Sequence, residues 1–148
     1  NDNVATDVEI VSTGSGNDVI TGSDSVFGDS GDDSLYGGDG SDTINGGSGA
    51  DYIAGEGDSD LLQGQDGNDT MDGGAGGDTM SGGNGDDSMA GGAGADSIWG
   101  DANADKLYNG TFAAEADGSQ DTLNGGTGTD TSYGADANDV LSNIETLL

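Results

Sequence analysis

The chain has 148 residues, of which 32 are glycine and 30 are Asp or Glu, and its formal net charge at pH 7 is -29. A compact globule with this charge repels itself, so we expect the metal-free chain to be unfolded and the folded chain to hold cations. Lys106 is the single basic residue, no apolar run approaches a membrane span, and there is no cysteine. Composition therefore argues against nucleic-acid binding, a membrane span and disulfides.

The N-terminal segment, residues 1–12, contains no glycine and includes the β-prone residues Val8, Ile10 and Val11. We expect it to cap one end of an apolar core. Repeats are expected over residues 13–108. The unit Gly22–Phe27 has only six residues and lacks three turn residues, so it predicts a tighter turn.

The stretch Gly28–Tyr108 is 81 residues long and divides into nine consecutive nonapeptides. Position 1 is always Gly, position 6 is always Asp, and position 8 is always Leu, Ile or Met. Glycine is also usual at positions 2 and 4, with these departures: Asp29, Glu56, Gln65, Asp101, Asp58 and Asn103. A disordered chain rarely keeps two residue columns in phase for so long, so the pattern predicts a repeating fold.

After Tyr108 the regularity weakens. We expect an inserted surface loop over residues 109–120, degenerate repeats over residues 121–142 with Ser132 in the apolar column, and a C-terminal cap over residues 143–148. The segment Val140–Leu147 aligns with Val4–Val11. This similarity has two interpretations: two caps that solve the same problem, or one period of a tandem array or head-to-tail stack.

Each nonapeptide is too short for a helix and predicts a three-residue strand with an inward apolar centre, followed by a tight glycine-rich turn. Two nonapeptides then form one coil, and successive strands lie alternately on two parallel sheets in roughly seven coils. The position-8 side chains should form a core one side chain wide, made of Ile20, Val26, Leu35, Ile44, Ile53, Leu62, Met71, Met80, Met89, Ile98, Leu107, Leu123 and Leu141.

Such a thin core cannot offset the entropy of ordering nine residues per strand, so the turns must contribute. Glycines permit positive φ and leave carbonyls free to face a common point, and the position-6 Asp adds a carboxylate. Oxygen donors without His or Cys favour calcium over zinc, copper or magnesium. We expect roughly seven to ten Ca²⁺ ions, held between coils along two edges by Asp18, Asp33, Asp42, Asp51, Asp60, Asp69, Asp78, Asp87, Asp96, Asp105, Asp121, Asp130 and Asp139.

The segments Gly37–Asn45, Gly46–Ala54 and Gly73–Ala90 follow the pattern G-G-x-G-x-D-x-U-x and resemble the calcium-binding repeats of RTX (repeats-in-toxin, hemolysin-type) proteins. The resemblance implies an all-β, right-handed parallel β-roll, a β-solenoid with two nine-residue repeats per coil. It also implies bacterial origin, export of the unfolded chain by type I secretion, and folding outside the cell. We expect the secretion signal to lie further along a longer parent protein. Departures from the pattern should weaken individual calcium sites.

Nothing in the sequence pairs a nucleophile with a base, since His and Cys are absent, so we expect no enzyme activity. The favoured role is a calcium-dependent folding and secretion module of a larger exported protein. One alternative is a structural unit of an extracellular array, S-layer or filament of end-to-end copies. Another is a polysaccharide-binding accessory module, for which the outward aromatic residues would provide stacking surfaces unless they shield the coil ends: Phe27, Tyr36, Trp99, Tyr108 and Tyr133.

Overall fold

A computed structural model describes residues 11–12, 14–21, 25–111, 118–135 and 138–148. Strands are the only regular elements in this described part. They are β1 (Val11–Ser12), β2 (Val19–Thr21), β3 (Ser25–Phe27), β4 (Ser34–Gly38), β5 (Thr43–Ser48), β6 (Tyr52–Gly57), β7 (Leu61–Asp66), β8 (Thr70–Ala75), β9 (Thr79–Asn84), β10 (Ser88–Ala93), β11 (Ser97–Ala102), β12 (Lys106–Tyr108), β13 (Thr122–Asn124), β14 (Thr131–Tyr133), β15 (Val140–Ser142) and β16 (Thr146–Leu147).

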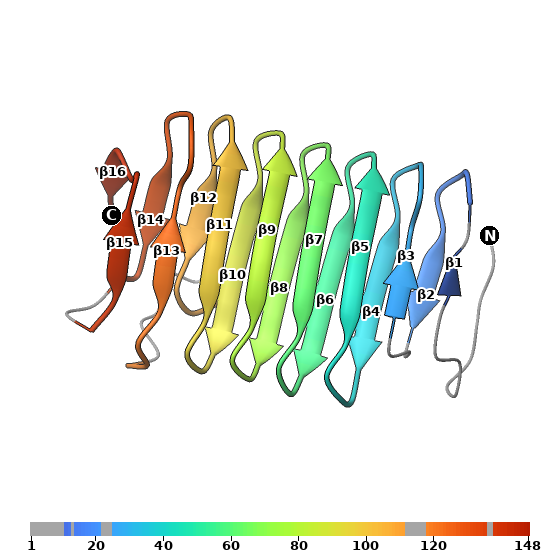
Figure 1. The fold of residues 1–148 in the computed structure, drawn as a ribbon, viewed down its shortest axis with the longest axis horizontal. Coiled ribbons are helices and arrows are strands. Elements are labelled where there is room, and N and C mark those ends of the chain that lie inside the picture. Colours follow the sequence, from blue (N-terminus) through green and yellow to red (C-terminus); the bar gives the residue numbers. More distant parts are fainter. Residues whose placement is uncertain (1–10, 13, 22–24, 112–117, 136–137) are drawn as a thin grey trace.

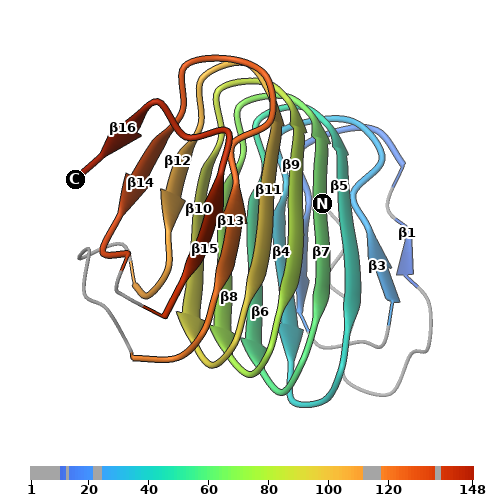
Figure 2. The same ribbon diagram turned by 60° about the vertical axis from the view of Figure 1, so that its left-hand side comes forward.

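The strands form two eight-stranded sheets that face each other (Figures 1 and 2). The odd-numbered strands, β1 to β15, form the first sheet, and the even-numbered strands, β2 to β16, form the second sheet. Every pairing is parallel, because the chain crosses to the opposite sheet after each strand and returns one coil further along. The result is the predicted β-solenoid, of about 7 turns.

The register follows the repeat. Ile44 pairs with Leu62, and Met71 with Met89. The seven extra residues after Tyr108 do not disturb it, since Ile98 pairs with Leu123 and Leu107 with Ser132. Insertions in a solenoid project from a turn, so the strands on either side keep their places in the sheets.

The apolar column forms the core. All predicted members from Ile20 to Leu123 are 0 % exposed. The prediction for Leu141 is wrong: it pairs with Leu123 as expected, yet it is 36 % exposed. Its strand, β15, is the last in the first sheet, so no further coil covers it among the described residues. Ser132 lies in the apolar column, as predicted, and is fully buried.

The strands are longer than predicted. From β5 to β11 each has six residues instead of three, because pairing continues into the next repeat, as in Gly47 with Gln65 and Ser48 with Asp66. Successive residues of a strand point to opposite faces, so position 1, two residues after position 8, also points to the interior. In β5 and β8 both positions are buried. Glycine at position 1 permits this, because it adds no side chain to the interior. The turn proper is therefore confined to positions 4 to 6.

Two sequence predictions fall largely outside the described residues. The N-terminal cap is represented only by β1, which pairs with β3. The segment Val4–Val11 and the middle of the predicted inserted loop, residues 112–117, are likewise not described.

Candidate metal centre

The predicted aspartates line the two edges of the solenoid where the chain passes between sheets. The first edge, where the chain enters the second sheet, carries Asp18, Asp33, Asp51, Asp69, Asp87, Asp105 and Asp130. The second edge, where it enters the first sheet, carries Asp42, Asp60, Asp78, Asp96, Asp121 and Asp139. All of them are at most 5 % exposed except Asp139, which is partly buried. Thus the structure brings each predicted group into one of two columns.

One carboxylate oxygen of Asp33, and of each position-6 aspartate from Asp51 to Asp139, accepts a hydrogen bond from a backbone N–H in the preceding coil. The backbone N–H of Asp33 donates to Oδ1 of Asp51 at 2.8 Å, and the N–H of Asp42 donates to Oδ1 of Asp60 at 2.8 Å. The same bond recurs along both columns, including across the insertion, where Asp96 donates to Asp121 and Asp105 to Asp130. The carboxylates are therefore fixed in position by the backbone.

The other oxygen, Oδ2, is buried and accepts no hydrogen bond within the described residues in Asp33, Asp51, Asp60, Asp69, Asp78, Asp87, Asp105 and Asp130. A buried ionised oxygen without a partner is strongly unfavourable. These oxygens recur coil after coil, and the chain contains one Lys and no Arg to neutralise them. When these carboxylates are ionised, a cation from solution would provide the partner that their buried oxygens lack.

Burial also raises the pKa of these carboxyl groups. Desolvation is the largest cause, the backbone hydrogen bond to each group opposes it, and the charges of neighbouring aspartates raise the pKa further. The pKa reaches about 6 in Asp60 and Asp69, and about 7 in Asp87 and Asp105. Without a cation, these groups therefore resist ionisation near neutral pH.

The position-1 glycines complete the surroundings of Oδ2. A Cβ atom added to Gly73 would collide with the carbonyl oxygen of Gly91, in the next coil, and with Oδ2 of Asp78. The same two kinds of oxygen surround the corresponding point in Gly28, Gly37, Gly46, Gly55, Gly64, Gly82 and Gly100. Each coil therefore places a carboxylate and a carbonyl oxygen around a space that only glycine leaves open.

This donor set fits calcium. Because each of these Oδ2 atoms lies beside a glycine carbonyl oxygen, a metal cage here would combine carboxylates with backbone carbonyls. Calcium accepts such mixed, irregular oxygen shells, whereas zinc and copper favour the nitrogen and sulfur donors that this chain lacks.

The non-glycine residues at positions 2 and 4 have the positive φ that glycine has at these positions in other repeats. At position 2, Asp29, Glu56, Gln65 and Asp101 have φ between 67° and 81°, and at position 4, Asp58 and Asn103 have φ of 67° and 85°. Non-glycine residues rarely adopt this region, so the turn is imposed by the surrounding coils. These substitutions leave the path of the turn unchanged.

The family model of the RTX calcium-binding nonapeptide repeat matches the chain over residues 6–25, 21–53, 45–80, 54–89, 81–113 and 114–141. The chain belongs to this family. Comparison of this RTX chain with curated proteins and with solved structures gave no significant match. Its described residues include no helix long and apolar enough to cross a membrane.

Sequence reasoning missed one acidic member of the columns. Oε2 of Glu145 accepts the backbone N–H of Asp130 at 2.6 Å and so extends the first edge by one coil. The spacing of 15 residues between Asp130 and Glu145 equals that between Asp18 and Asp33. Residues 143–148 thus form a second six-residue unit like Gly22–Phe27, and this spacing was the available signal. Asp24 of the earlier short unit lies outside the described residues.

Proposed function

We propose that this chain is a calcium-dependent folding module, with the thirteen position-6 aspartates from Asp18 to Asp139 as carboxylate ligands. The observation that supports it recurs coil after coil on both edges: a buried Oδ2 atom that has no hydrogen-bond partner among the described residues lies beside a glycine carbonyl. Calcium neutralises these oxygens and joins adjacent coils, so binding and folding are one process. Roughly seven to ten ions would be bound.

Calcium titration followed by far-UV circular dichroism tests this proposal. We expect an unfolded spectrum in chelator and a cooperative gain of β-structure with a midpoint of about 10⁻⁴–10⁻³ M, the range of extracellular calcium modules. Magnesium at the same concentration should not replace calcium, because it demands a regular octahedral shell. Equal β-structure in chelator would refute the proposal.

The coupling of folding to calcium binding suggests where the protein folds and acts. A chain that folds only at such calcium concentrations remains unfolded in the cytoplasm and folds outside the cell. We therefore propose that it forms part of a larger bacterial protein that is exported unfolded by type I secretion and acts extracellularly. Limited proteolysis tests this: the chain should be cleaved throughout in cell lysate and protected in calcium-containing medium. Equal protection in lysate would contradict it.

The RTX solenoid is a structural type of domain, and we propose no catalytic activity for this chain. Among the described residues, every buried acidic side chain lies in one of the two columns, and the sequence has neither His nor Cys. Any reaction of the parent protein would then be carried out by another domain.

A structural role in an end-to-end array is a second candidate. At the C-terminal end of the solenoid, Leu141, Leu147 and Leu148 are 36 %, 61 % and 67 % exposed, and β15 and β16 are the last strands of their sheets (Figure 1). A further parallel coil from another copy would cover these leucines and pair with both strands. Light scattering of the calcium-loaded protein tests this, and a purely monomeric protein would argue against it.

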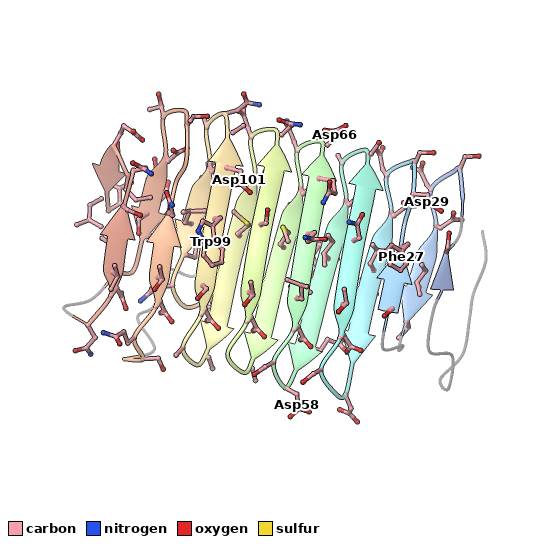
Figure 3. The ribbon with its side chains drawn as sticks, in the orientation of Figure 1. Phe27, Asp29, Asp58, Asp66, Trp99 and Asp101 are labelled. Atoms are coloured by element: carbon pink, nitrogen blue, oxygen red, sulfur yellow. The ribbon has the colours of Figure 1, made fainter. Side chains whose placement is uncertain are left out.

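Polysaccharide binding is a third candidate. Phe27 and Trp99 lie on the outer face of the first sheet, four coils apart, as Figure 3 shows. By contrast, Tyr108 and Tyr133 on the second sheet stack on each other at 4.6 Å, which favours shielding of the coil end there. A glycan array tests this role, with Trp99→Ala expected to reduce any binding and Tyr108→Ala expected to leave it unchanged.

A further inference from the structure

Asn109 stands at position 1, where the regular repeats from Gly28 to Tyr108 all have glycine. Asn109 follows Tyr108, the last residue of a repeat, and its side chain is 0 % exposed. It therefore stands where Gly91 stands one coil earlier and where Gly125 stands on the opposite edge. In those coils glycine leaves open the space beside the Asp carboxylate, whereas here an amide side chain occupies the interior.

The amide is bonded at both ends. Its Nδ2 donates to Oδ2 of Asp139 at 3.1 Å, and its Oδ1 accepts the backbone N–H of Gly110 at 2.9 Å. The other oxygen of Asp139, Oδ1, accepts the backbone N–H of Asp121 at 3.1 Å. Both oxygens of Asp139 therefore have protein donors, unlike Asp78, whose Oδ2 accepts no hydrogen bond among the described residues.

The turn that follows also differs. The chain takes 25 residues from Asp96 to Asp121, compared with 18 between Asp78 and Asp96. The seven extra residues fall between position 1 and position 6, the segment that we expect to supply backbone carbonyls in the regular turns. The step between Asp121 and Asp139 thus has a side chain in place of the open space, and the turn that leads to Asp121 is seven residues longer than a regular one.

We propose that Asn109 replaces a calcium ion between Asp121 and Asp139, so that this step of the second edge binds no metal. This inference rests on the proposed function and removes Asp139 from its thirteen ligands, because both carboxylate oxygens of Asp139 accept hydrogen bonds from the protein. An N–H donor directed at a carboxylate oxygen occupies the lone pair that a cation would use, and it provides the partner that the buried oxygen requires. The long turn can then vary without breaking the fold, since no ion depends on its carbonyls.

The decisive experiment counts bound calcium ions by native mass spectrometry in wild type and in Asn109→Gly. We expect the variant to bind one ion more, because glycine restores the open space. The matched control is Asn103→Gly, the same substitution at a position-4 turn residue with φ of 85°, which should leave the count unchanged. An unchanged count in Asn109→Gly, with the protein folded, would overturn the proposal.

A second pair of variants covers the case in which Asn109→Gly does not fold. Asp139→Asn should leave the wild-type ion count unchanged, whereas Asp78→Asn should lower it by one. Loss of an ion in Asp139→Asn would overturn the inference. A wild-type protein that binds no calcium would instead refute the proposed function, so the two failures are distinguishable.

Discussion

The middle coils, residues 28–108, and the C-terminal coils, residues 109–148, share one backbone register. They differ in the residues at positions 1, 6 and 8 of the repeat. In the middle coils each column is uniform: glycine at position 1, aspartate at position 6 and a fully buried apolar side chain at position 8. In the C-terminal coils Asn109 stands in the glycine column, Ser132 in the apolar column and Glu145 in the aspartate column. Asn109 and Glu145 each supply a hydrogen bond from within the protein, whereas we propose that the middle coils depend on calcium ions.

The glycine column gives the largest expected effect. In the middle coils, Gly73→Ala would push a methyl group against the carbonyl of Gly91 and the carboxylate of Asp78. We expect a loss of about 3 kcal/mol or more in the free energy of unfolding at saturating calcium. Chemical denaturation measures it, with Gly57→Ala as the control, because its Cβ would have only one neighbour, at 3.9 Å. Equal losses in the two variants would contradict a closed space at position 1.

The apolar column gives the next largest expected difference between the middle and the C-terminal coils. Met80 in the middle coils is 0 % exposed and Leu141 in the C-terminal coils is 36 % exposed. We expect Met80→Ala to cost about 2–5 kcal/mol and Leu141→Ala less than about 1 kcal/mol, because only the first leaves an internal cavity. Denaturation of both variants in calcium measures the difference. Comparable costs would mean that Leu141 is covered in solution.

Substitutions in the aspartate column test whether calcium ions bind there. In Asp69→Asn the amide oxygen can still accept the N–H of Asp51, so only the charge at the open oxygen is lost. We expect the calcium midpoint of folding to rise about tenfold, or about 1.4 kcal/mol. Asp32→Asn, an equal change of charge at an exposed turn residue, should shift it less than about twofold. Equal shifts would indicate that net charge alone governs calcium dependence.

The pH dependence should reverse with calcium. The pKa values of Asp60, Asp69, Asp87 and Asp105 are raised from 3.8 to about 6 or 7 in the folded state. Their contribution to metal-free stability is therefore fully present below the unfolded pKa and is lost as pH rises through about 6 to 7. In chelator we expect more β-structure at about pH 5 than at about pH 8. In calcium the order should invert, because protons compete with the ion; circular dichroism at both pH values checks this.

The smallest effect concerns Ser132 in the C-terminal coils. It is 0 % exposed, its register neighbours are Leu107 and Leu147, and its hydroxyl has no hydrogen-bond partner among the described residues. Ser132→Val should stabilise the calcium-loaded protein by about 1 kcal/mol, since it buries methyl groups and removes an unpaired polar atom. Ser132→Ala should give a smaller gain. A loss of stability in both variants would show that the hydroxyl has a structural partner.

Much of the fold can be predicted from the sequence because the nine-residue repeat determines it. A column at every ninth residue specifies strands that alternate between two sheets, and a spacing of 18 residues places one aspartate above another on the same edge. The residue types add the donor chemistry, since oxygen ligands without His or Cys indicate calcium. The two edges and the apolar column from Ile20 to Leu123 could therefore be predicted without coordinates.

What only the tertiary structure decided depends on which coil lies next to a residue. The strands extend to six residues because position 1 turns inward against the neighbouring carbonyl. Leu141 is exposed because β15 ends its sheet, although its place in the repeat is unremarkable. Asn109 meets Asp139, 30 residues away, and Glu145 meets Asp130 across a shortened unit. The repeat fixes contacts that recur in every coil, whereas contacts at an insertion or at the end of the solenoid depend on the local path of the chain.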